Sequence, residues 1–248
     1  MRKKSAEKTG SWIGLQHWYQ RPLGRLFGKA EAGSLAGILP ALFGYHIVAL
    51  GSPTGCDLLA ASPIAHRCCL DWVQPLAGTA VDVFAEPAWL PIATDSVDVV
   101  VLPHVLEFVA EPHAVLREVD RILIPEGYAI ILGFNPLSLW GGWRWFFTRG
   151  RKTPWDAHFL SVRRLRDWLA LLGFEIISVQ YGFYRPPWGR LLPRLAFLER
   201  LGPKYWPAGG GGYVLLAKKR LSTLTPVKPR WHSRQLPVAA GAVNRGIG

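Results

Sequence analysis

The sequence predicts an α/β protein whose central, mostly parallel sheet is covered by helices on both faces. Short apolar runs alternate with helical patterns along most of the chain, which is typical of strands joined by crossover helices. Half of the 248 residues are apolar and 19% are charged. A chain of this length and composition can bury a large core, and a protein disordered throughout is excluded.

Residues 11–44 are expected to be helical with breaks, and seven apolar runs follow them. The predicted strands are 46–50, 66–70, 79–84, 97–102, 127–133, 174–181 and 212–217. No clear helical pattern separates the sixth run from the seventh. We therefore expect a seven-stranded sheet whose last strand is antiparallel to the others.

Two stretches carry the clearest helical patterns. In 111–123, Val115, Val119 and Ile122 recur at helical spacing. In 161–174, Ser161 is a plausible N-cap and Gly173 the expected stop. Both stretches are predicted to cover the sheet.

The predicted domain organisation has three parts. Residues 1–44 form an N-terminal helical cap, 45–220 the sheet domain, and 221–248 a flexible tail with four basic and no acidic residues. The sheet domain contains two insertions, 134–155 and 184–212, rich in aromatic residues or proline. Both follow strand ends, where open α/β sheets build ligand sites.

The net charge of +12 indicates an anionic partner. A phosphate-bearing substrate, a nucleic acid and a membrane surface all satisfy this requirement, and charge alone does not choose among them. The basic start of the chain lacks the apolar run of a signal peptide. The uncharged stretch 32–56 is interrupted by Pro40, His46 and several glycines, which predicts a buried helix end and a strand rather than a transmembrane span.

The three cysteines, Cys56, Cys68 and Cys69, form no CxxC motif. We expect reduced structural thiols in a cytoplasmic protein, with Cys68 and Cys69 on opposite faces of a strand. The seven histidines are scattered, so no metal site is expected.

Residues 83–135 contain an ordered series of short motifs. They are Glu86 followed by Leu90-Pro91, then Ser96-Val97-Asp98, His104-Val105-Leu106-Glu107, Leu116-Arg117-Glu118, Arg121-Ile122-Leu123 and Pro125-Glu126-Gly127. In order and spacing this series resembles the core of the class I S-adenosylmethionine-dependent methyltransferases, specifically the type-11 group that includes ubiquinone-biosynthesis-like enzymes. The resemblance covers roughly residues 45–183 and implies a Rossmann-like fold with S-adenosylmethionine as cofactor.

The resemblance assigns Glu86 to the adenine amine, with Ala85 or Pro87 beside the ring. Leu102 and Pro103 would face the methyl donor at the end of the fourth strand. His104 is a candidate general base because imidazole titrates near neutrality. The alternative, which we favour, is that His104 shapes the pocket, since many methyl transfers need only proximity and an apolar site.

Glu107 is expected to orient the turn that follows. Arg117, Glu118 and Arg121 fit a salt-bridged helix face without a catalytic role.

The loop after the first strand, "GSPTG", matches the family's glycine motif only in part. Ala49 stands where the family has an acid, and Pro53 replaces the second glycine. Gly51, Ser52 and Gly55 would still let the backbone approach the donor's methionine end. Asp71 is either the acid that binds the ribose or a solvated loop aspartate.

The segment "FNPLSLWGGWRWFF" supplies the candidate substrate wall. Interleaved tryptophan and arginine suit a lipid-like acceptor, a membrane interface or stacked bases, and an internal aromatic cluster is the structural alternative. The residues singled out are Asn135, Ser138, Trp140, Trp143 and Arg144.

Two functional interpretations follow. The first is a methyltransferase acting on a small-molecule or lipid-like acceptor. The second is a methyltransferase-like protein that has lost catalysis and binds a partner, an anionic surface or a nucleic acid. RNA methylation is supported only by charge.

Overall fold

The structure is a computed structural model. It describes residues 2–74, 81–147, 157–186, 195 and 197–220, with the side chains of 2–8 and 144–147 left out. The predicted basic tail, 221–248, lies outside the described residues.

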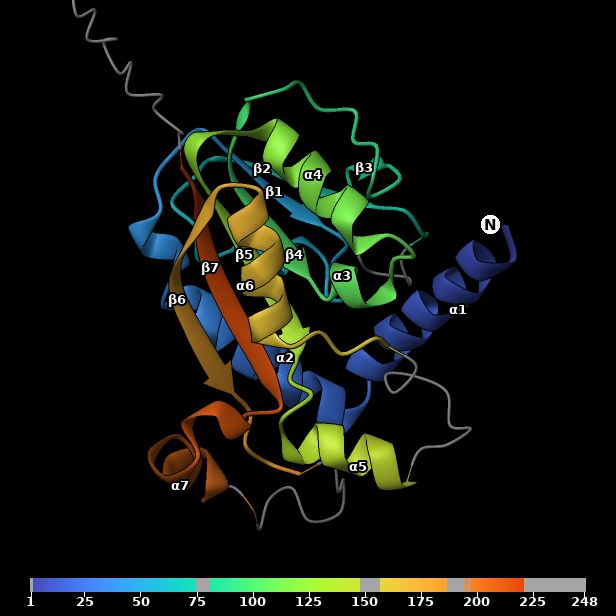
Figure 1. Cartoon of the computed structure of the whole chain (residues 1–248), viewed down its shortest axis with the longest axis vertical. Helices are drawn as coiled ribbons and strands as arrows, with labels where there is room; N and C mark the ends of the chain where they lie inside the picture. The colour runs from blue at the N-terminus through green and yellow to red at the C-terminus, as the bar shows by residue number, and fades with distance from the viewer. Residues whose placement is uncertain (1, 75–80, 148–156, 187–194, 196, 221–248) are drawn as a thin grey trace, which may run out of the picture.

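Within the described residues the sheet has seven strands in the order β3-β2-β1-β4-β5-β7-β6 (Figure 1). Strand β7 pairs antiparallel with β5 and β6, and the remaining pairs are parallel. The predicted antiparallel return of the last strand is therefore confirmed. The strand bounds are β1 His46–Leu50, β2 His66–Asp71, β3 Val83–Phe84, β4 Val97–Pro103, β5 Leu123–Phe134, β6 Phe174–Gly182 and β7 Gly212–Lys219.

Helices lie on both faces of the sheet (Figure 1). Helices α4 and α6 cover one face (Figure 1), while the end of α2 and the short turns η1 and η2 pack against the other through Leu35, Leu39, Leu58 and Leu59. The bounds are α1 Arg2–Tyr19, α2 Pro22–Ala36, η1 Leu39–Ala41, η2 Cys56–Leu59, α3 Val105–Phe108, α4 Pro112–Ile122, α5 Leu139–Phe147, α6 Val162–Leu171, α7 Leu198–Tyr205 and η4 Pro207–Gly209.

Side chains of β1 alternate between two buried clusters. Val48 and Leu50 belong to the cluster under α4 and α6, and Ile47 and Ala49 to the cluster on the opposite face. This alternation follows from the two-residue period of a strand. A sheet buried on both faces explains why its strands appear in the sequence as continuous apolar runs.

Most predicted elements are confirmed with small changes at their ends. Strand β5 begins at Leu123 rather than 127, because Leu123 pairs with Val97 across an irregularity in the register. Strand β3 contains only Val83 and Phe84 of the predicted 79–84, and residues 79 and 80 lie outside the described part. Ser161 caps α6 by accepting a hydrogen bond from the backbone of Arg164. Gly173 follows that helix with a φ of +80°, which suits glycine.

The expectation of reduced cysteines is wrong for two of the three. Cys56 and Cys69 form a disulfide, with their Cα atoms 5.9 Å apart. The short turn η2 folds back against β2 and brings Cys56 beside Cys69. No sequence motif predicts this contact between the two segments. Cys68 is free and packs against the other core cluster, so the two adjacent cysteines do lie on opposite faces.

Asp82 lies close to this disulfide. One group of metal-binding residue types was found among the described residues, and it consists of Cys56, Cys69 and Asp82. Sulfurs joined in a disulfide are not thiolate ligands, so this group does not form a metal site as it stands. In the described part of the chain, no helix is both long and apolar enough to span a membrane.

Candidate active site

The parallel strands β1, β2, β3 and β4 have their C-terminal ends along one edge of the sheet. Helices α1 and α2 lie across that edge. Helix α1 passes beside α3, and its N-terminal end projects beyond the sheet (Figure 1). The inner face of α1 is buried at Trp12, Leu15, Gln16 and Tyr19. The N-terminal segment therefore covers the edge at which parallel α/β sheets bind ligands.

Gly51 begins the loop at the end of β1 and has a φ of +63°, a left-handed conformation that favours glycine. A Cβ at this position would lie 2.6 Å from the ring of Trp72 and 3.1 Å from that of Trp12. The Ser52 hydroxyl donates a 2.6 Å hydrogen bond to the carbonyl of Gly55. The loop is thus held by its own contacts, and two indole rings lie against its glycine.

Asp71 ends β2 and is fully buried. One carboxylate oxygen accepts hydrogen bonds from the backbone amides of Trp72 and Val73, at 2.8 and 3.2 Å. The other oxygen accepts a longer one, 3.4 Å, from the Trp12 indole. Burial raises the pKa of Asp71 to about 6, although these hydrogen bonds oppose the shift. The alternative of a solvated loop aspartate is therefore wrong, because α1 covers this carboxylate.

Glu86 follows β3 and is exposed. Its backbone carbonyl accepts a hydrogen bond from the amide of Trp89, which forms a tight turn. Ala85 is half-buried and its amide donates to the carbonyl of Asp71, so β2 and β3 end side by side. This places Ala85 and Glu86 beside Asp71 along the same edge.

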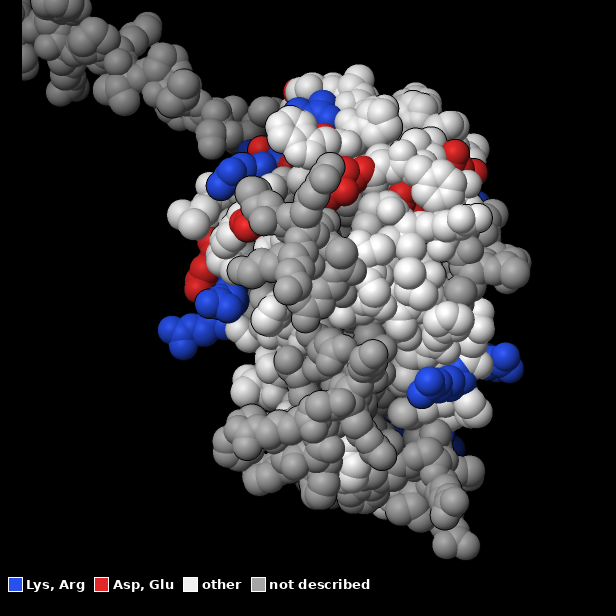
Figure 2. Space-filling view, turned by 90° about the vertical axis from the view of Figure 1, so that its right-hand side faces the viewer, with Lys and Arg blue, Asp and Glu red and all other residues white. Residues whose placement is uncertain are grey.

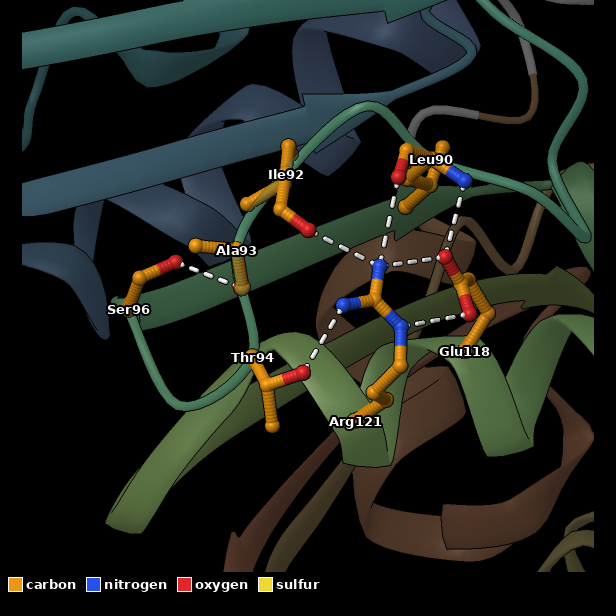
Figure 3. Close-up of polar contacts among 7 residues, drawn as sticks. All are labelled: Leu90, Ile92, Ala93, Thr94, Ser96, Glu118 and Arg121. Atoms are coloured by element: carbon orange, nitrogen blue, oxygen red, sulfur yellow. Dashed lines mark hydrogen bonds and ion pairs between the residues drawn. The ribbon is translucent and has the colours of Figure 1, made fainter.

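The segment after Glu86 is fixed by two charged residues of α4. Glu118 accepts a hydrogen bond from the amide of Leu90, and its other contacts join it to Arg121 (Figure 3). Arg121 donates to the carbonyls of Leu90 and Ile92 and to the hydroxyl of Thr94. Because Arg121 lies beside it, the pKa of Glu118 is lowered. The predicted salt bridge is confirmed for Glu118 and Arg121, while no ion pair of Arg117 is seen in the described part of the chain. The Glu118–Arg121 pair also anchors the connection between β3 and β4.

His104 follows β4 and is fully buried. Its Nδ1 lies 2.7 Å from a carboxylate oxygen of Glu107, and its Nε2 lies 2.6 Å from one of Glu31 on α2. The backbone φ of His104 is +60°, in the left-handed region that non-glycine residues rarely adopt. Two carboxylates thus hold the imidazole of a residue whose backbone conformation is uncommon, as expected where surrounding contacts dictate the backbone.

The carboxylates around His104 have further partners. Glu107 accepts a hydrogen bond from the backbone amide of Phe134 on β5, and Glu31 accepts one from the hydroxyl of Tyr19 on α1. This chain of contacts, which we call the His104 cluster, contains Tyr19, Glu31, His104 and Glu107. It ties both N-terminal helices to the ends of β4 and β5.

Charge within the His104 cluster favours an imidazolium. Burial alone lowers the pKa of His104, but Glu31 and Glu107 outweigh it and raise the pKa to about 9. Burial raises the pKa of Glu107, while the imidazolium opposes that shift. At neutral pH both nitrogens of His104 carry protons directed at carboxylates.

A doubly protonated imidazole cannot take a proton from an acceptor. The general-base role of His104 stays a prediction that this geometry does not favour, and the pocket-shaping role is the one its contacts support. Leu102 and Pro103 are buried within and at the end of β4, so their side chains contribute to the core beneath the site.

The candidate substrate residues have internal partners. Asn135 donates to the carbonyls of Ala208 and Gly210, and the hydroxyl of Ser138 donates to the carbonyl of Asn135. The indole of Trp140 is buried and donates to the carbonyl of Arg185. These contacts fix the connection after β5 to the segment before β7, as the alternative of an internal aromatic cluster predicts.

Two further candidates lie on α5. Trp143 is half-buried, and the side chain of Arg144 lies outside the described residues. The substrate roles of all five residues stay predictions.

The sequence analysis assigned no role to the N-terminal residues that reach the site. A signal for Glu31 exists, because Phe27, Glu31 and Leu35 recur at four-residue spacing and share the buried face of α2. An acid on such a face needs a buried partner. Its partner, His104, could not be identified, since it lies 73 residues further along the chain.

Comparison with known proteins supports the same family from sequence. Residues 54–131 match a family model described as a methyltransferase domain. The uncharacterized protein YafS of Escherichia coli is 30% identical over 230 residues, which cover 92% of this chain and 91% of that protein.

Solved structures share the fold at low sequence identity. An S-adenosylmethionine-dependent methyltransferase from Thermotoga maritima has a TM-score of 0.61 at 20% identity, covering 82% of this chain and 93% of that one. One from Archaeoglobus fulgidus has a TM-score of 0.54 at 16% identity, with 76% and 92% covered.

The [4+2]-cyclase SpnF has the same fold, with a TM-score of 0.54 at 16% identity over 77% of this chain and 80% of its own. The fold by itself therefore does not fix the reaction. The sequence relationships and the strand order together show that the chain belongs to the class I S-adenosylmethionine-dependent methyltransferases.

Proposed function

We propose that this protein transfers a methyl group from S-adenosylmethionine to a small-molecule or lipid-like acceptor. The observation that carries the proposal is the pairing of Gly51 and Asp71 at adjacent strand ends, inside a chain that belongs to this family. A left-handed glycine permits close backbone approach, and a carboxylate at the end of the next strand suits the two hydroxyls of a ribose.

The residues present fit such a donor in their chemistry. Asp71 is buried and has one oxygen held only by a long hydrogen bond, so that oxygen can accept shorter ones from a ligand. Exposed Glu86, two residues beyond β3, would accept from the adenine amine, with half-buried Ala85 beside it. The loop with Gly51, Ser52 and Gly55 would lie under the methionine end, above the buried Leu102 and Pro103.

When bound, S-adenosylmethionine supplies an electrophilic methyl group on a sulfonium. The chain's own contribution is to align an acceptor and to exclude water. Aromatic rings of α1, α2 and β5 pack around His104, with the Phe134 ring 4.2 Å and the Phe27 ring 6.0 Å from its own. The apolar surface that these rings form suits a neutral or lipid-like methyl acceptor rather than a highly charged one.

A small pocket beside Glu31, with room for about one water molecule, has an apolar lining that would suit part of such an acceptor. It lies between α2 and the facing ends of β6 and β7, and Phe27, Phe183 and Tyr213 contribute to its lining. The Tyr213 hydroxyl is buried and has no hydrogen-bond partner in the described part of the chain. Burying a hydroxyl without a hydrogen-bond partner costs free energy, and a polar group of the methyl-accepting substrate would supply that partner.

The second candidate is a methyltransferase-like protein that no longer binds the donor and acts by binding a partner. Its support is specific: Ala49 and Pro53 replace expected motif residues, and Trp12 and Trp72 lie against Gly51. These two tryptophans fill space at the loop where the family binds its cofactor.

An anionic surface and a nucleic acid remain proposed partners on the basis of net charge alone. Figure 2 shows one face of the molecule, where Lys and Arg of the described residues are scattered rather than gathered in one patch. Peripheral contact with a membrane has a separate basis in large apolar side chains that are exposed near α5 and α7: Leu137, Leu139, Phe197, Leu201, Tyr205 and Trp206.

A cytoplasmic location also stays a prediction. The Cys56–Cys69 disulfide weakens its cysteine argument, because disulfides are more common in oxidising compartments.

The proposal is tested by titrating the folded protein with S-adenosylhomocysteine in a calorimeter, beside the variant Glu86→Ala. We expect saturable binding by the wild type, weaker by roughly tenfold to a hundredfold in the variant, since one charge-assisted hydrogen bond contributes about 1.5–3 kcal/mol. No binding by folded wild type would refute the proposal and favour the second candidate. If the wild type binds, a mass-shift search for metabolites that lose their methylation when the gene is deleted would identify the acceptor.

A further inference from the structure

The groups assigned to the donor are already engaged by the chain itself. Trp12 is fully buried and its indole N–H donates to Asp71, the residue assigned to the ribose. The same ring lies 4.4 Å from the ring of Trp72, centroid to centroid, and approaches Gly51. Trp12 therefore takes the hydrogen-bond acceptor and the loop contact that the proposed function gives to the donor.

The contacts of Trp12 are weak for so buried a position. The bond to Asp71 is 3.4 Å long, whereas the bonds that hold α2 to His104 and to Tyr19 are both 2.6 Å. One turn after Trp12, Gln16 is only 2% exposed, yet both polar atoms of its side chain lack a partner in the described part of the chain. Burying an amide without partners costs about 1–3 kcal/mol.

Gln16, with its unpaired amide, lies on the part of α1 that covers the C-terminal ends of the strands. Trp12, Gln16 and Tyr19 share one face of α1, because residues three and four apart are neighbours on a helix. Trp12 contacts Asp71 at the end of β2, and Tyr19 joins the His104 cluster at the end of β4. Gln16 lies between them, so the unsatisfied amide belongs to the part of α1 that covers the donor groups.

We propose that Trp12 is an internal competitor of the methyl donor, and that the part of α1 from Trp12 to Gln16 is a gate that must move before the donor binds. This inference rests on the proposed function. The gate is anchored at Tyr19, whose hydroxyl is hydrogen-bonded to Glu31, which in turn contacts His104. The moving part is the segment of α1 from Trp12 to Gln16, whose buried side chains have weaker hydrogen bonds or none among the described residues. Moving it would expose the Gln16 amide to water or ligand and free Asp71 for the ribose hydroxyls.

The test compares S-adenosylhomocysteine affinity among full-length variants. Trp12→Ala removes the competitor, so we expect binding at least about threefold tighter than the wild type. Trp12→Phe keeps a ring against Trp72 but loses the N–H bond to Asp71, and its affinity should lie between the two. Trp168→Phe, on α6 and in contact with His113, is the matched control and should bind as the wild type does.

The outcomes separate the gate from the proposal beneath it. If circular dichroism shows that Trp12→Ala is folded and its affinity for S-adenosylhomocysteine is no higher than that of the wild type, the gate is refuted. An affinity lower than that of the wild type would make Trp12 part of the donor's pocket. If no variant binds S-adenosylhomocysteine, the proposed use of the donor is refuted and the gate with it.

Discussion

The ends of β2 and β4 lie on the same edge of the sheet and are both covered by the N-terminal helices, but they are held very differently. At β4, His104 has a carboxylate within 2.7 Å of each ring nitrogen. At β2, the side chain that covers Asp71 is joined to it by one 3.4 Å hydrogen bond. The N-terminal helices are thus fixed near the proposed site of methyl transfer and only lightly held near the proposed site of the donor's ribose.

This difference assigns separate tasks to the two positions. Strong pairing at β4 suits a structural anchor, because a buried ion pair that loses one partner leaves an uncompensated charge. Weak pairing at β2 suits a site that a ligand competes for. If β2 carried the anchor and β4 the site for which a ligand competes, the effects on stability and on ligand binding that we expect would be exchanged.

The largest expected effect is on stability, from His104→Ala. The substitution leaves Glu31 and Glu107 buried without their common partner, so the free energy of unfolding should fall by about 3–5 kcal/mol. Urea denaturation monitored by circular dichroism measures it. His46→Ala, at an exposed histidine, is the control and should change stability by at most about 0.5 kcal/mol. Similar effects of the two variants would mean that the His104 cluster is not an anchor.

The next effect concerns the Cys56–Cys69 disulfide, which lies beneath the loop at the β2 side. The cysteines are 13 residues apart, and closing a loop of that size stabilises a protein by about 3 kcal/mol. Cys56→Ala should therefore lower the free energy of unfolding under oxidising conditions but not under reducing ones. Cys68→Ala, at the free cysteine, keeps the disulfide, so its difference in stability from the wild type should be the same with and without reductant. If both variants respond alike to reductant, the disulfide does not form in solution.

A smaller effect is expected on ligand binding from Asp71→Asn. The amide keeps the shape but accepts fewer and weaker hydrogen bonds, so S-adenosylhomocysteine affinity should fall by roughly tenfold to a hundredfold. Stability should not fall, because burial already disfavours the charged carboxylate, whose pKa is raised to about 6. Asp167→Asn, at an exposed position on α6, is the matched control. A loss of stability with unchanged affinity would make Asp71 a structural residue.

The last effect is a pH dependence that belongs to the β4 side. The pKa of His104 rises from 6.5 to about 9 on folding, so its contribution to stability is complete below pH 6.5 and is lost as the pH rises toward 9. A single proton gives a slope of at most about 1.4 kcal/mol per pH unit. Asp71 titrates in a lower window, between 3.8 and about 6, and does not overlap. Wild type should show the decline between pH 6.5 and 9, and His104→Ala should lack it; a persisting decline would exclude His104 as its source.

Sequence reasoning was most successful where a local pattern carries the information. Apolar runs located β1, β2, β4 and β7 to within two residues at each end, and the helical stripe located α4. The motifs that resemble the methyltransferase family placed Glu86 and His104 correctly just after strands. These features depend on neighbours a few residues apart, which a single sequence displays directly.

The contacts that define the site could not be predicted in the same way. Trp12 and Asp71 are 59 residues apart, and Glu31 and His104 are 73 apart. Nothing local to Asp71 distinguishes a buried carboxylate from a solvated one, because its cover comes from another segment. The Cys56–Cys69 disulfide depends likewise on how η2 folds back onto β2, and the spacing of the cysteines does not reveal it.

The comparison between β2 and β4 is tested most directly by hydrogen exchange along the whole chain, with and without saturating S-adenosylhomocysteine. With the ligand bound, we expect slower exchange in the loop from Gly51 to Gly55 and at Trp72 and Val73. We expect faster exchange in α1 around Trp12 and Gln16, and little change around His104. Protection of α1 together with that loop would contradict the gate. No ligand-dependent change at the ends of β1 and β2 would contradict the donor site itself.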